Sequence, residues 1–176
     1  PGTGGSRSVR LPAWSLLLLA GFAAMPARAD LLAGRVTLVV DGDSLRLKDA
    51  RSGVEHGVRI VGIEAPDRRS KAGKSAHQTL AALLYNKEVA VAGVFVGKGF
   101  VGRVLVAAPG CRQPNCPKDL DAGLAQVEAG MAWWDARYSG FPEPVRRSYE
   151  AAEFQAKIRR LGLWAGRDTF PPWATP

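Results

Sequence analysis

The order of strand and helix patterns after Asp30 is the sequence feature that most constrains the fold. Alternating apolar and polar residues, or runs of β-branched residues, predict strands at 32–40, 44–48, 58–63, 88–96 and 101–107. Helical spacing of apolar residues predicts helices at 75–85, 120–129 and about 144–161. Three strands, a helix, two strands and then two helices fit a small closed barrel with helices packed on its outside.

The predicted fold class is therefore α+β: a five-stranded OB-fold β-barrel with three packed α-helices. No internal repeat or low-complexity linker follows Asp30, so residues 30–176 are predicted to form one domain. Hydrophobic residues make up 47% of the chain and charged residues 23%, which excludes a disordered or fibrous protein. The net charge of +8 favours an acidic partner only weakly.

The N-terminal segment has the pattern of a secretory signal peptide. Arg7 and Arg10 precede an apolar run from Leu11 to Met25, and Ala27-Arg28-Ala29 supplies the small residues of a cleavage site before Asp30. The alternative is a membrane anchor, but the run is shorter than the roughly 20 residues that span a bilayer. We expect residues 1–29 to be a signal peptide and the mature protein to be periplasmic or secreted. We also expect a monomer without stable membrane association.

The chain has only two cysteines, Cys111 and Cys116. An exported protein meets an oxidising compartment, where this pair is expected to form a disulfide that stiffens a surface turn. The alternative is a zinc site, which needs two further ligands, and His56 and His77 lie far away in the sequence.

Four carboxylates and two arginines fall within the predicted sheet region; they are Asp41, Asp43, Glu64, Asp67, Arg59 and Arg103. Carboxylates that lie close together repel one another unless a cation sits among them. Arginines beside them repel that cation unless an anion such as phosphate completes the set. The combination predicts a metal-assisted phosphodiester site.

Six short motifs carry a resemblance to a known family. They are Asp-Gly-Asp-Ser at 41–44, Arg-x-x-Gly-Ile-Glu-Ala-Pro-Asp at 59–67, Gly-Lys-x-Ala at 73–76, Gly-Arg at 102–103, Ala-Glu at 152–153 and Gly-Leu-Trp at 162–164. Their order resembles that of staphylococcal nuclease-like (thermonuclease) domains, and the match covers nearly all of residues 31–173. A single motif of this kind is weak, whereas the ordered series is specific.

The resemblance implies a Ca²⁺-dependent phosphodiesterase on an OB-fold, with one bound ion. By the same resemblance, Asp43 and Glu64 would be carboxylate ligands and Ala65 a backbone-carbonyl ligand. Asp67 would orient or deprotonate the attacking water. The two arginines of the predicted site, Arg59 and Arg103, would hold the phosphate and neutralise charge in the transition state.

Further residues are candidates for contacts with DNA or RNA. A basic loop is predicted at 68–74, and its side chains Arg68, Arg69, Lys71 and Lys74 would contact backbone phosphates; the alternative is a solvated loop. Tyr138 is the tyrosine that remains near a position where the family often carries an aromatic residue.

The chain departs from the family pattern at two places. Most members have Asp where this chain has Glu64 and Glu where it has Asp67, so the two acids are exchanged. Val101 occupies the position of a tyrosine that lines the nucleotide pocket. This loss predicts weaker nucleotide binding, unless Phe100 or one of the tryptophans Trp133 and Trp134 substitutes for the tyrosine. At least one of these two tryptophans is predicted to pack between helix and barrel.

The sequence thus predicts an exported Ca²⁺-dependent nuclease that hydrolyses DNA or RNA. The alternative is a catalytically weak or inactive OB-fold module that binds nucleic acid through the same face. A third interpretation is an exported scaffold, but retention of both Arg59 and Arg103 argues against it, because scaffolding needs no phosphate-binding groups.

Overall fold

The computed structural model describes residues 2, 30–111, 113, 115–166 and 170–174. The predicted signal peptide, apart from Gly2, therefore lies outside the described residues. Within the described part of the chain, no helix combines the length and the apolar character that crossing a bilayer requires.

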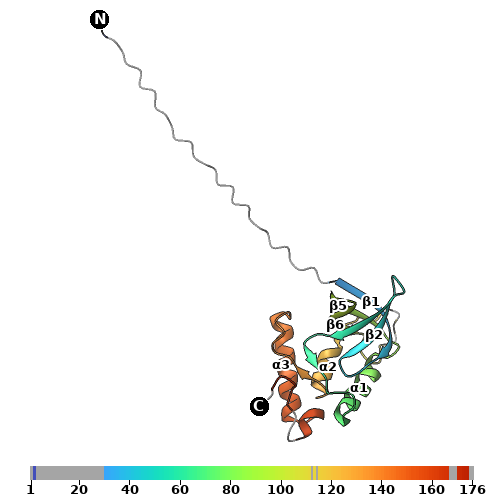
Figure 1. Cartoon of the computed structure of the whole chain (residues 1–176), viewed down its shortest axis with the longest axis vertical. Coiled ribbons are helices and arrows are strands. Elements are labelled where there is room, and N and C mark those ends of the chain that lie inside the picture. The colour runs from blue at the N-terminus through green and yellow to red at the C-terminus, as the bar shows by residue number, and fades with distance from the viewer. Residues whose placement is uncertain (1, 3–29, 112, 114, 167–169, 175–176) are drawn as a thin grey trace.

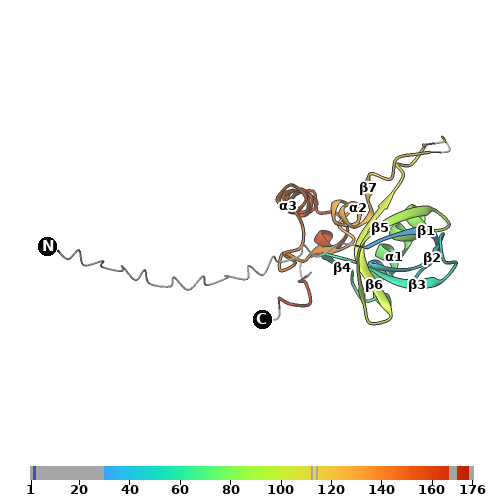
Figure 2. The same cartoon turned by 90° about the horizontal axis from the view of Figure 1, so that it is seen from above.

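Five strands form a closed barrel, as predicted (Figures 1 and 2). They are β1 (Asp30–Val39), β2 (Ser44–Asp49), β3 (Glu55–Ile60), β5 (Glu88–Val96) and β6 (Gly99–Val106). Neighbours in the order β3-β2-β1-β5-β6 are antiparallel, and a parallel pairing of β3 with β6 closes the barrel. Closure removes the free edges that an open sheet would expose.

The core lies inside the barrel and beneath the helices. Alternate residues of the strands face inward, so Val36, Leu47, Val58, Val91 and Val104 are all at most 2% exposed. Each such side chain contributes about 1.5–3 kcal/mol relative to an exposed one. The residues between them face outward, and Arg59 of the candidate site is one of these.

Three helices pack around the barrel: α1 (Lys71–Leu84), α2 (Ala122–Glu128) and α3 (Glu143–Ile158), followed by the short 3₁₀ helix η1 (Gly162–Ala165). Helices α2 and α3 lie together on one side of the barrel (Figure 2). The prediction of a basic loop at 68–74 was partly wrong, because α1 begins four residues earlier than Ser75. The Ser70 hydroxyl accepts the Gly73 N–H at 2.9 Å and caps the helix there.

Three two-residue strands escaped the sequence analysis: β4 (Ile63–Glu64), β7 (Leu120–Asp121) and β8 (Trp133–Trp134). The strand predicted at 58–63 instead stops at Ile60, because Gly62 turns the chain with a φ of +76°. Beyond this turn, β4 pairs with β8 and sets Glu64 opposite Trp133. The barrel therefore carries a small ribbon beside the predicted site.

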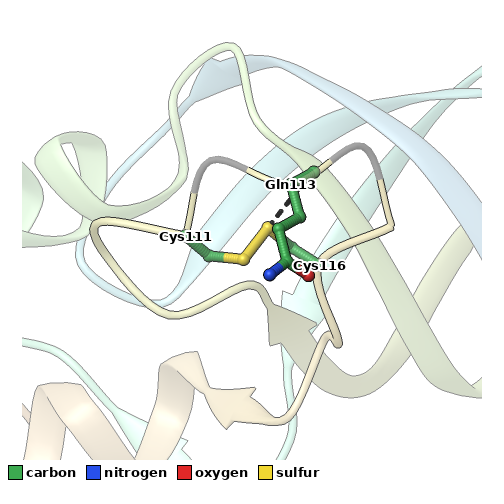
Figure 3. The surroundings of a disulfide bond; sticks show 3 residues. All are labelled: Cys111, Gln113 and Cys116. Carbon is green, nitrogen blue, oxygen red and sulfur yellow. Dashed lines mark hydrogen bonds between the residues drawn. A yellow bond between two sulfur atoms is a disulfide. The ribbon is translucent and has the colours of Figure 1, made fainter.

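The connection between β6 and β7 contains both cysteines. It extends away from the barrel (Figure 2), and a disulfide joins Cys111 to Cys116 with their Cα atoms 6.0 Å apart (Figure 3). The disulfide therefore restrains a surface turn and lies outside the hydrophobic core.

Candidate active site

The turn between β1 and β2 directs Asp43 into the protein. The Asp41 carboxylate accepts the Asp43 N–H at 3.1 Å and the Ser44 hydroxyl at 2.6 Å, which closes a tight turn. A Cβ atom on Gly42 would lie 2.6 Å from the Cβ atoms of both Ala65 and Ala76, so only glycine fits there. The turn thus places a carboxylate against the chain that follows β4.

The Asp43 carboxylate is buried, with its side chain only 4% exposed. Its Oδ2 accepts the Ala65 N–H at 2.9 Å and lies 3.4 Å from Nη2 of Arg59. Burial raises the pKa of Asp43 to about 7, although the Ala65 N–H and the Arg59 guanidinium act in the opposite direction. The groups around Asp43 therefore compensate its negative charge incompletely.

Arg59 lies between Asp43 and Glu64. It occupies an outward position on β3, and its Nη2 is 2.6 Å from Oε2 of Glu64. Two carboxylates from separate segments thus face the same guanidinium nitrogen. The structure thus brings together Asp43, Arg59 and Glu64, which were singled out from the sequence. The Ala65 N–H contacts the same Asp43 carboxylate.

Whether these residues fit a calcium ion depends on the number of oxygen donors. Within the described part of the chain, no group of three or more His, Cys, Asp or Glu side chains forms a metal site. Calcium takes six to eight oxygen ligands, which include backbone carbonyls and waters as well as carboxylates. The incompletely compensated Asp43 and the adjacent Glu64 therefore fit a hard cation whose other ligands come from carbonyl, water and phosphate oxygens.

Asp67 lies beside this centre but faces another partner. Its Oδ2 is 2.7 Å from Nη2 of Arg69, and the hydrogen bonds from Arg69 lower the pKa of Asp67 to about 2. Arg68 instead donates a hydrogen bond to the carbonyl of Val40. Two members of the predicted basic loop thus already have protein partners.

These residues line one cleft of about 730 Å³. Its lining residues come from the β1–β2 turn, β3, β4, the segment before α1, β8 and the C-terminal segment: Asp41, Asp43, Arg59, Glu64, Ala65, Pro66, Asp67, Arg68, Arg69, Ser70, Trp133 and Pro172. Trp133 borders this cleft, but its side chain is buried like that of Trp134, at 6% and 8% exposed.

Other predicted binding residues lie elsewhere. Lys71 and Lys74 are exposed on α1, and neither is among the described residues that line the cleft. Tyr138 packs edge-to-face on Phe141, with ring centroids 4.9 Å apart, and it is not among the cleft residues either.

Arg103 shares the outer face of the β3–β6 pair with Arg59. Val101 is the register partner of Arg59, and Arg103 is two residues further along β6. The Nε of Arg103 donates to Oδ2 of Asp121 at 2.6 Å, and the Asp121 side chain is only 2% exposed. A buried acid therefore holds the second predicted arginine.

The role of Asp121 was not predicted, because the helix was expected to span 120–129 and so to include this residue. Asp121 instead caps α2, and its Oδ1 accepts the N–H groups of Gly123 and Leu124 at 3.0 and 3.3 Å. The same oxygen accepts the Tyr149 hydroxyl at 3.0 Å. Aspartate is a preferred N-cap residue, so the capping rule could have found this helix start.

Gln126 is a second residue whose role was not predicted from the sequence. This residue on α2 is fully buried, and its side-chain amide donates to the carbonyls of Gly42 at 2.8 Å and Ala76 at 3.0 Å. Gln126 therefore connects the Asp43 turn to α1 through these two buried hydrogen bonds. Its position 84 residues away from Gly42 leaves no local signal in the sequence.

Comparison of the sequence with those of known proteins gives a family match and several relatives. The family model described as "Staphylococcal nuclease homologue" matches residues 57–166. An "Uncharacterized endonuclease" of Escherichia coli is 30% identical over 80% of this chain and 82% of its own length. The "Micrococcal nuclease" of Shigella flexneri is 35% identical over 85% of this chain and 82% of its own length. "Protein ParB" of Escherichia coli is 32% identical over 85% of this chain.

Proposed function

Because this chain belongs to the staphylococcal nuclease family, we propose that it is an exported, calcium-dependent nuclease that hydrolyses phosphodiester bonds of DNA and RNA. The family model and the relatives named as nucleases support the nuclease activity. One observation supports the proposed site above the others: Nη2 of Arg59 faces the carboxylates of both Asp43 and Glu64, at 3.4 and 2.6 Å.

In the proposed mechanism, Asp43, Glu64 and the Ala65 carbonyl would hold the calcium ion. The ion would polarise a phosphoryl oxygen and help to neutralise the phosphate. Arg59 lies beside these ligands and binds the phosphate, and a guanidinium suits this role because its parallel N–H groups match phosphate oxygens. Arg103 approaches from β6 on the same face and binds the developing negative charge.

Asp67 is the proposed acceptor of the water proton. It lines the same cleft and is ionised, and its pairing with Arg69 lowers its pKa and so makes it a weaker base until the pair is broken. The water oxygen bonds to phosphorus and one water proton passes to Asp67. The bond from phosphorus to the leaving oxygen breaks, and the leaving alkoxide takes a proton from solvent water.

A cleavage assay tests this proposal. The purified protein is incubated with a labelled single-stranded oligonucleotide in calcium or in EDTA, beside an Arg59→Ala variant. Arg35→Ala is the matched control. Arg35 is also a half-exposed arginine in an ion pair, but it lies on β1 and its partner is Glu88 of β5. We expect calcium-dependent cleavage that Arg59→Ala reduces by at least about 100-fold and Arg35→Ala leaves unchanged.

The alternative function, a weak or inactive nucleic-acid-binding module, is favoured by the ion pair that occupies Asp67. Binding of the oligonucleotide without cleavage in calcium would select this alternative. Cleavage that persists at full rate in EDTA would reject the calcium dependence.

Export is a separate part of the proposal and has its own test. The signal-peptide pattern of residues 1–29 supports it. Expression in a Gram-negative bacterium, followed by fractionation and N-terminal sequencing, should give a periplasmic or secreted protein that begins at Asp30. An unprocessed chain in the cytoplasm or membrane would contradict export.

A further inference from the structure

A short turn in the C-terminal segment lies beside the active-site cleft. The Ala174 N–H donates to the Pro171 carbonyl at 2.9 Å, so residues 171–174 form a β-turn. Pro172 occupies the second position of this turn, which its fixed φ favours, and it lines the cleft. The family model matches residues 57–166, so this feature lies beyond the matched part of the chain. We call it the 171–174 turn.

Trp173, the third residue of the 171–174 turn, packs on Arg137. The guanidinium carbon of Arg137 lies 4.4 Å from the centroid of a Trp173 ring, which is within the range of a cation–π interaction. Trp173 is half-buried, whereas 63% of the Arg137 side chain is exposed. The tryptophan thus covers one face of the guanidinium while much of the arginine stays accessible to solvent.

Asp135 fixes the plane of the same guanidinium. Its Oδ1 accepts a hydrogen bond from Nε of Arg137 at 2.7 Å, and its Oδ2 accepts one from Nη2 at 2.9 Å. Asp135 is itself held, because its backbone N–H donates to the Gly62 carbonyl at 2.9 Å. Nη1 of Arg137 has no hydrogen-bond partner among the described residues. One edge of a fixed guanidinium is therefore left for an anion.

Two neighbours show that Arg137 borders the active-site cleft. Hydrogen bonds to Asp135 raise the pKa of Arg137, and the charge of Glu64, a cleft residue, acts in the same direction. On another side, the turn that covers Arg137 contributes Pro172 to the cleft. Arg137 itself is not among the described residues that line the cleft. Its position therefore suits an anion at the rim of the cleft.

The alternative is that Arg137 and Asp135 form only a local ion pair on the surface. Arg103 has the same arrangement within the proposed site, because Asp121 holds its Nε and leaves its terminal nitrogens free. A local ion pair also needs no third partner, yet an aromatic ring from a distant segment is stacked on Arg137. A carboxylate on one edge and a ring on one face orient the guanidinium toward a further ligand.

We propose that Arg137, held by Asp135 and Trp173, is a third phosphate-binding arginine, and that it binds the phosphate next to the scissile one. Trp173 is then a positioning residue, and the 171–174 turn is part of the substrate site. The proposal rests on the proposed function, because it takes the scissile phosphate to lie at Arg59. A substrate with a second phosphate should therefore gain affinity from Arg137, and a substrate with one phosphate should not.

Binding without catalysis tests this site separately from the nuclease activity. Competition with a fluorescent oligonucleotide in EDTA measures the affinities for TpT, which has one phosphate, and for a 12-nucleotide oligo(dT). We expect Arg137→Gln to reduce the affinity for the 12-mer roughly tenfold and to leave that for TpT unchanged. For the 12-mer, the slope of log affinity against log salt should become shallower by about 0.7.

Arg147→Gln is the matched control. Arg147 is also an exposed arginine in an ion pair, but it lies on α3 and its partner is Glu143. This variant should leave both affinities and the salt dependence unchanged.

Variants of Trp173 test the positioning role. Trp173→Ala removes the stacked ring and should reduce the affinity for the 12-mer about threefold, whereas Trp173→Phe keeps an aromatic face and should reduce it less than twofold. In the Arg137→Gln background, Trp173→Ala should have no further effect, because the ring acts through the arginine. In calcium, Arg137→Gln should raise KM for the 12-mer and leave kcat unchanged, because the phosphate that it binds does not react.

Three results would overturn the proposal: an unchanged affinity for the 12-mer in Arg137→Gln, an equal loss for TpT and the 12-mer, or a full additional loss from Trp173→Ala in the Arg137→Gln background. Absence of cleavage in calcium is a different result. If the dependence of 12-mer affinity on Arg137 is retained, it would reject the proposed nuclease activity and keep the phosphate site.

Discussion

The Nε of Arg103 donates to Oδ2 of Asp121 across 2.6 Å, which leaves the two terminal nitrogens of the guanidinium for another anion. Asp121 is itself fixed, because it caps α2 and accepts the Tyr149 hydroxyl. Burial and the Asp121 charge raise the pKa of Tyr149, so this hydroxyl stays a hydrogen-bond donor. The start of α2 therefore orients an arginine of the proposed site.

This relationship predicts that Asp121→Asn impairs catalysis through Arg103. The asparagine oxygen still caps the helix, but the charge that holds Arg103 is lost. We expect kcat to fall roughly 10- to 100-fold, with a loss of about 1–3 kcal/mol in unfolding free energy.

The double variant Asp121→Asn, Arg103→Ala distinguishes positioning from a general structural effect. If Asp121 acts through Arg103, the double variant has the same kcat as Arg103→Ala alone. Additive losses would show that the effect of Asp121 is independent of Arg103.

A second prediction concerns calcium and Asp43. Ligand binding at 100 times Kd stabilises the folded state by about 2.7 kcal/mol, so calcium should raise the melting temperature by roughly 5–10 °C. Asp43→Asn should abolish this rise, because the buried carboxylate is a proposed ligand. The same change removes an incompletely compensated buried charge, so it should raise the melting temperature of the calcium-free protein.

Differential scanning calorimetry with and without calcium measures both effects. Asp119→Asn is the control, since Asp119 is an exposed carboxylate just before β7. An undiminished calcium effect in Asp43→Asn would show that the ion binds elsewhere.

A third prediction concerns the exchanged acids Glu64 and Asp67. Each exchange moves a carboxylate by about one bond, or 1.5 Å, and a 1 Å displacement can reduce the rate about 100-fold. If the longer Glu64 and the shorter Asp67 compensate for each other, Glu64→Asp or Asp67→Glu alone lowers kcat/KM. The double variant then recovers most of the loss. Single changes that each increase kcat/KM, with additive effects, would reject compensation.

A fourth prediction concerns Gln126, which holds the Asp43 turn. Gln126→Leu leaves the carbonyls of Gly42 and Ala76 without their buried donor, which should lower the unfolding free energy by about 2–4 kcal/mol. Urea denaturation measures this loss. Gln78→Leu on the exposed face of α1 is the matched control and should change stability by less than about 0.5 kcal/mol. Similar losses in the two variants would contradict a specific role for Gln126.

The barrel was predictable because its strands carry their pattern locally. Residues such as Leu45 and Leu47 alternate with Arg46 and Lys48, and this period of two identifies a half-buried strand from the sequence alone. The short strands were not predictable, because two residues such as Trp133 and Trp134 are too few to show a period. Their strand conformation comes from pairing with β4, which is distant in the chain.

The same distinction applies to the candidate site. Arg59 and Glu64 were found because they lie five residues apart in a recognisable motif, and the structure places them in contact. The contacts of Arg103 with Asp121 and of Gln126 with Gly42 cross 18 and 84 residues, so only the folded chain reveals them. The pairing of Asp67 with Arg69 is local, but one acid followed by two arginines leaves the choice of partner open.

The disulfide between Cys111 and Cys116 has a practical consequence for preparing the protein. It closes only its own turn, while the strands on either side, β6 and β7, are joined separately by the pairing of Leu105 with Asp121. We therefore expect the register of these strands to survive dithiothreitol in a purification buffer or synthesis in an ordinary bacterial cytosol, so that the protein can be produced without oxidative refolding.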